Sequence, residues 1–175
     1  MTTPSRFIGR AHDFDFLLGY WHVHNRRLRQ RHAGCEVWDE FPATSQAWVM
    51  LDGAVSVDET RFPTQGFSGM TLRTLDPATK LWSIYWINSA SGQLFPPVRG
   101  GFDGERGEFH GEDSDAGRAV RVRFIWTRLG PDAARWQQAF ALEGGAWEEN
   151  WVMALTRAQA APPARTASSH RRLGT

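Results

Sequence analysis

Hydrophobic and polar residues alternate along most of the chain, in short segments separated by turn residues. Alternation with a period of two is typical of half-buried β-strands. Gly, Pro, Asn and Asp clusters divide the alternating segments roughly every ten residues. The pattern therefore predicts strands over residues 20–28, 35–43, 46–61, 66–75, 81–89, 97–103, 107–113, 118–129, 134–142 and 146–157, the third of them kinked at Gly53.

The expected strands follow one another through short turns, and helix is expected only within residues 11–18. Sequential hairpins favour a meander, which gains stability when it closes and removes its edge strands. We therefore predict an all-β fold, a single antiparallel meander β-barrel of about nine or ten strands with a short helical turn before the first strand. A two-sheet sandwich is the competing arrangement. The barrel domain would span residues 1–157, and residues 158–175, with three arginines and no acid, would form a disordered basic tail.

The first strand opens with Gly19-Tyr20-Trp21, and alternation places Trp21 on one face with Val23, Asn25 and Arg27. This face is predicted to point inward because a large indole gains most from burial. Gly-x-Trp before a long meander, with Arg157 ending the last strand, resembles the signature of the calycins. This group comprises lipocalins, fatty-acid-binding proteins and nitrobindin-like barrels, and bacterial calycin-like families with no assigned function are similar to "FDFLLGYWHVHNRRL". The resemblance implies that Arg157 packs across Trp21.

The composition indicates which classes of partner and which cellular compartment to expect. The net charge of +1 gives no global field for nucleic acid, so we expect no nucleic-acid partner. No segment approaches the roughly 18 apolar residues of a membrane span, and the N-terminus shows no apolar signal segment. Cys35 is the single cysteine, so an internal disulfide is excluded and a cytoplasmic location is expected.

Motifs for cofactors and catalysis are weak. His22 and His24 have a spacing that can chelate a metal, but they lie opposite the face of Trp21, so they are expected in solvent and no metal is predicted. Nitrobindin-like barrels bind haem through a histidine near the end of the barrel, yet none lies between His110 and His170, so no cofactor is expected. No Gly-x-Ser-x-Gly or phosphate-binding loop occurs. Catalysis by an isomerase, cyclase or hydrolase on a hydrophobic substrate is the alternative to binding.

The resemblance and the inferred interior predict a cavity that binds a small, largely hydrophobic molecule with an anionic or polar group. Arg27 would neutralise that group, since a guanidinium matches a carboxylate or phosphate. An acid on an apolar inward face needs a partner, so Glu149 is expected opposite Arg27. The facing of the strand over residues 120–127 is open. The candidate ligand-binding residues are Asn25, Arg27, Trp38, Trp86, Arg123, Gln138, Glu149 and Trp151. The sequence also allows a homodimer.

Overall fold

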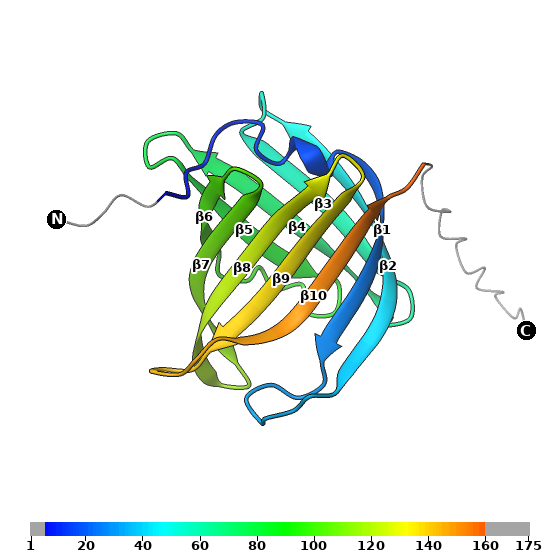
Figure 1. The fold of residues 1–175 in the computed structure, drawn as a ribbon, viewed down its shortest axis with the longest axis vertical. Coiled ribbons are helices and arrows are strands. Elements are labelled where there is room, and N and C mark those ends of the chain that lie inside the picture. Colours follow the sequence, from blue (N-terminus) through cyan, green and yellow to red (C-terminus); the bar gives the residue numbers. More distant parts are fainter. Residues whose placement is uncertain (1–5, 160–175) are drawn as a thin grey trace, which may run out of the picture.

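The computed structural model describes residues 6–159, so nearly all of the predicted basic tail lies outside the described residues. A single closed antiparallel barrel runs through the chain, with each strand paired to its neighbour in sequence and β1 paired to β10 (Figure 1). This confirms the predicted meander barrel and excludes the sandwich. The elements are η1 (Asp15–Leu17), β1 (Gly19–Leu28), β2 (Trp38–Met50), β3 (Val55–Phe62), β4 (Phe67–Asp76), β5 (Leu81–Asn88), β6 (Val98–Asp103), β7 (Arg106–Asp115), β8 (Arg118–Gly130), β9 (Ala133–Ala141) and β10 (Glu148–Arg157).

The short 3-10 turn η1 covers one end of the barrel, which we call the closed end (Figure 1). Leu17 of η1 and the preceding Phe14 are buried, and Phe14 packs edge-on against Trp82 and Phe102. A backbone hydrogen bond from the His12 N–H to the Gly53 carbonyl, 3.1 Å long, holds the segment against the β2–β3 turn. The predicted helical turn before the first strand is therefore present, and it acts as a plug.

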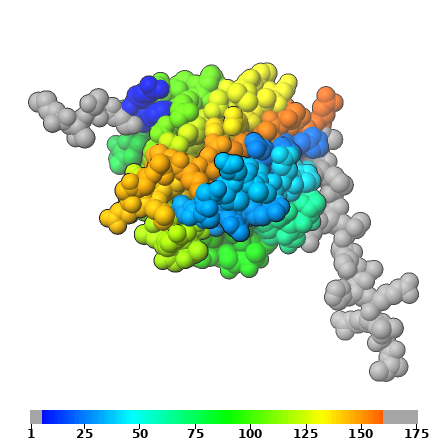
Figure 2. All heavy atoms as spheres, turned by 60° about the horizontal axis from the view of Figure 1, so that its bottom comes forward, coloured from blue at the N-terminus to red at the C-terminus, as the bar shows by residue number. Residues whose placement is uncertain are grey.

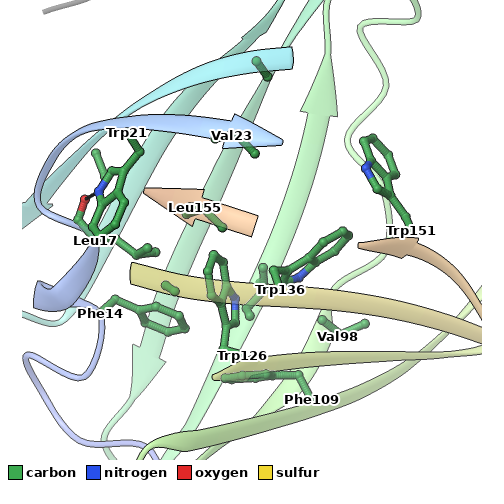
Figure 3. Packing of buried hydrophobic residues seen from close by; sticks show 14 of the residues in the cluster. Phe14, Leu17, Trp21, Val23, Val98, Phe109, Trp126, Trp136, Trp151 and Leu155 are labelled. Atoms are coloured by element: carbon green, nitrogen blue, oxygen red, sulfur yellow. Dashed lines mark hydrogen bonds between the residues drawn. The ribbon is translucent and has the colours of Figure 1, made fainter. Parts of the chain in front are cut away.

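Trp21 lies inside this end with 1% of its surface exposed, and its indole donates a 2.8 Å hydrogen bond to the Leu17 carbonyl (Figure 3). The Arg157 guanidinium lies over the Trp21 ring, 4.3 Å from its centroid. Arg157 also donates to the carbonyls of Leu18, Phe16 and Pro131. The expected contact between the first and last strands is thus confirmed, and it also ties η1 to the barrel.

The strand prediction needs one correction, between residues 35 and 61. Residues 38–50 form one long strand, and the chain reverses in a turn over residues 51–54 before β3. Gly53 therefore lies in a turn, with φ of 84°, and does not kink a continuous strand. The predicted continuous strand is wrong here because Leu51 and Asp52 also take positive φ values, and a leucine seldom indicates such a turn.

The outer wall carries most of the exposed polar side chains of β1. His22 and His24 are exposed there, and His24 lies 3.2 Å from the Glu40 carboxylate. Within residues 6–159 no group of three His, Cys, Asp or Glu side chains is placed to hold a metal ion. Over the same residues no helix has the length and apolar character needed to cross a membrane.

Candidate ligand-binding cavity

The barrel encloses a cavity of about 280 Å³ that runs from the closed end towards the opposite end, which we call the rim. Its wall is mainly aromatic and aliphatic. Space for the Trp86 ring comes from Gly69 on the neighbouring strand, because any Cβ at that position would overlap the indole. The apolar lining consists of Leu17, Trp21, Val23, Ala47, Phe67, Ile84, Trp86, Phe95, Pro96, Val98, Val122, Phe124, Trp126, Trp136, Phe140, Trp151, Met153 and Leu155.

Arg27, near the end of β1, places a cation in this wall. Its guanidinium lies over the Trp151 ring, 4.9 Å from the centroid, and makes no ion pair within 4 Å among the described residues. Burial lowers the pKa of Arg27 from its ordinary value, and the positive charge of Arg31 acts in the same direction. An arginine nevertheless stays protonated at neutral pH. The cavity therefore contains a half-buried positive charge that is paired directly with no carboxylate among the described residues, although the more distant Asp115 and Asp39 attract it.

A second arginine, Arg31, forms an ion pair at the rim. Arg31 donates to both carboxylate oxygens of Asp115, at 2.8 and 2.6 Å. These hydrogen bonds hold the pKa of the Asp115 carboxyl below its ordinary value. The His32 backbone donates to Glu148, which joins the β1–β2 connection to the start of β10 (Figure 2). In contrast to Arg27, Arg31 has its charge neutralised by a partner.

Polar side chains also gather towards the closed end, where we define a deep polar cluster of Ser45, Ser56, Asp58, Thr60 and Arg73. Arg73 donates to Asp58 at 2.5 Å and to Ser56 at 3.3 Å. The Thr60 hydroxyl lies 3.0 Å from the Ser45 oxygen and 3.3 Å from Asp58 Oδ2. Every member is more than nine-tenths buried, and all but Ser56 line the cavity. The cluster has no net charge because one arginine meets one carboxylate.

Four of the eight predicted site residues line the cavity together. They are Arg27, Trp86, Gln138 and Trp151. Asn25 lies behind this wall, fully buried, with its amide donating to the Phe41 carbonyl and accepting from the Trp151 indole. It therefore orients Trp151, and its polar atoms are already used within the protein.

The expected inward facing of Glu149 is wrong. A β-bulge between Glu149 and Trp151 inserts Asn150 and reverses the alternation, so that Glu149 is exposed and bonds to Gln137 at 2.5 Å. Glu149 consequently does not meet Arg27. The sequence pattern assumed an unbroken strand from Trp147 onward.

Trp38 and Arg123 also lie away from the cavity. Trp38 is at the start of β2, on the face opposite Phe41, and stacks with Arg26 at 5.0 Å. The open question about β8 is resolved by the lining, in which Val122 and Phe124 point inward, so Arg123 points outward and stacks with Trp147 at 4.8 Å. Both side chains form cation–π contacts outside the wall.

Sequence reasoning missed the deep polar cluster and the Arg31–Asp115 pair. A usable signal was present in "VSVDETRF", where Ser56, Asp58 and Thr60 alternate in phase with Phe62. This segment carries polar residues on its inward face and valines on its outward face, which inverts the usual pattern. An inward polar face in a closed barrel is a signature of a polar subsite.

These features define a class of protein, a closed ten-stranded barrel with an internal cavity that carries separate polar groups at its two ends. No protein-family model matches the chain. Among curated proteins, the chain is 28% identical over 110 residues to the ribosomal RNA small subunit methyltransferase H of Albidiferax ferrireducens. The match covers 61% of this chain and 36% of that protein, so the chain spans about a third of that relative's length. Similarity of this extent does not establish a shared family.

Proposed function

We propose that this protein is a calycin-like carrier that binds a small, largely hydrophobic molecule with an anionic group inside its barrel. The closed antiparallel meander, the packing of Arg157 on Trp21 and the cavity all agree with this class of barrel. An apolar pocket with a few placed polar groups is the usual form of a small-molecule site. The similarity to a methyltransferase is too limited to direct the proposal towards RNA modification.

The observation that carries the proposal is the unpaired charge of Arg27. A half-buried cation costs free energy unless an anion or water compensates it, and a ligand carboxylate would supply that compensation. The Trp151 ring beneath the guanidinium fixes its plane, and the rest of the wall offers apolar contact to a hydrocarbon body. A ligand would therefore place its anionic group at Arg27 and its apolar part against Trp86, Trp136 and Phe124.

Calorimetric titration with dodecanoate and hexadecanoate tests this function. The substitution Arg27→Gln should weaken binding by about 2 kcal/mol, or roughly thirtyfold, the size of a charge-assisted hydrogen bond. The matched control is Arg26→Gln on the same strand, whose side chain is outside the barrel, 3.4 Å from Glu40. It should bind as the unaltered protein does. Equal affinities for the Arg27 variant and the control would remove Arg27 from the site. If neither acid binds to the unaltered protein, the proposal is overturned.

Catalysis in the same cavity is the second candidate function. The Asp58 carboxylate, held by Arg73 and next to the Thr60 hydroxyl, favours it because acid–base chemistry needs a fixed titratable group in a water-poor site. Mass spectrometry of the acids recovered from the titration separates the two functions. Unchanged acids support a carrier, and a new product that is absent with heat-denatured protein supports an isomerase, cyclase or hydrolase.

A further inference from the structure

The deep polar cluster has hydrogen-bonding capacity that the protein itself does not use. The hydroxyls satisfy one another, because Ser45 can donate to the Thr60 oxygen while Thr60 donates to Asp58 Oδ2. Within the described part of the chain, however, the buried Nε of Arg73 has no hydrogen-bond partner. Buried polar groups are normally satisfied, so unused capacity on a cavity wall points to a ligand.

The chemistry of the cluster selects the kind of group that fits. A carboxylate is disfavoured there because Asp58 repels it and Arg73 is already neutralised by Asp58. A purely apolar end would leave the Nε of Arg73 buried without an acceptor, which costs free energy. A ligand hydroxyl satisfies both requirements, since it accepts from Arg73 and donates to an oxygen of Asp58, Ser45 or Thr60.

The distance between the two polar sites sets the shape of the ligand. Ser45 is the β2 partner of Trp21, and Thr60 is the β3 partner of Ser45, so these side chains lie at the level of Trp21. Arg27 is six residues beyond Trp21 along β1, a strand length of about 20 Å at the rise of roughly 3.3 Å per residue, which sets the scale of the separation between the cluster and Arg27. In Figure 3, Trp21 and Leu17 lie on one side of the packed interior and Trp151, the ring beneath Arg27, lies on the other. A ligand that reaches both sites has to be elongated.

We propose that the natural ligand is an elongated hydroxy acid, bound with its carboxylate at Arg27 and a hydroxyl at the opposite end in the deep polar cluster. This inference rests on the proposed binding function and adds the second polar group and the orientation. Aliphatic ω-hydroxy acids are the simplest members of the class. Rigid hydroxylated acids of similar length share the same two groups.

The test compares 12-hydroxydodecanoic and 16-hydroxyhexadecanoic acids with their parent acids by calorimetry. The quantity measured is the ratio of the dissociation constants of parent and hydroxy acid. In the unaltered protein, at least one chain length should bind about tenfold more tightly with the hydroxyl, the gain from one buried hydrogen bond. Thr60→Val, which keeps the shape and removes the hydroxyl, should bring that ratio towards one. Thr44→Val, on the outer face of the same β2–β3 region, should leave it at about ten.

The outcomes separate this inference from the function on which it rests. Parent and hydroxy acids that bind equally, with binding still dependent on Arg27, overturn the deep subsite and leave the carrier function standing. A ratio that survives in both Thr60→Val and Ser45→Ala places the hydroxyl elsewhere and also overturns the subsite. Failure of every acid to bind overturns both proposals. Near-ultraviolet circular dichroism of each variant confirms that the barrel is intact.

Discussion

Replacing Asp58 with alanine is expected to lower the free energy of unfolding by about 3–5 kcal/mol. The change leaves the Arg73 guanidinium, which is 2% exposed, without its carboxylate in a position that water reaches poorly. The rings of Phe14 and Trp126 lie 4.9 and 5.7 Å from this guanidinium, and their cation–π attraction compensates only part of the loss. Urea denaturation followed by tryptophan fluorescence measures the effect.

The double variant Asp58→Leu with Arg73→Met is the matched control. Removing both charges leaves no buried ion, so it should recover most of the stability lost in Asp58→Ala. A double variant as unstable as the single one would show that the carboxylate contributes mainly through packing or through Thr60. A loss below about 1 kcal/mol in Asp58→Ala would show that Arg73 is solvated in the folded protein.

Trp21→Ala is expected to cost about 3–5 kcal/mol of folding free energy, as for other buried large aromatic residues. It removes a side chain that is 1% exposed, its hydrogen bond to Leu17 and the ring beneath Arg157, so the closed end loses packing and a link between β1 and η1. Trp48→Ala is the control, because Trp48 is 38% exposed on the outer face of β2. Its cost should be at most about 1 kcal/mol. Similar losses of free energy in the two variants would contradict the closure of this end by Trp21.

The architecture was predictable because period-two alternation and turn residues act locally. The inward phase of β1 followed from Trp21 alone, and the contact with Arg157 followed from the calycin resemblance. Both predictions depend on few residues, and neither changes when the end of a strand is misplaced by a residue or two. The failure at Gly53 affected one strand boundary and left the strand order unchanged.

The site was less predictable because the sequence no longer tells which side chains point into the barrel once the alternation of a strand is interrupted. One inserted residue, Asn150, turned Glu149 from the cavity to the exterior. β8 presents arginines and apolar residues in alternation, and only closure of the barrel shows that Phe124 and not Arg123 is inside. The Asp58–Arg73 pair joins residues of adjacent strands whose polar phase contradicts the expectation of an apolar interior. The role of such interior polar groups can be inferred only once the cavity that they line is known.

The most direct measurement is the position of dodecanoate in a crystal of the complex. We predict its carboxylate within about 3 Å of the Arg27 guanidinium, a normal hydrogen-bond distance, with the hydrocarbon chain between Trp151 and Trp86. Residues at the closed end should contact only the far end of that chain. Density for the acid on the outer wall, or a carboxylate directed towards Asp58, would contradict the account.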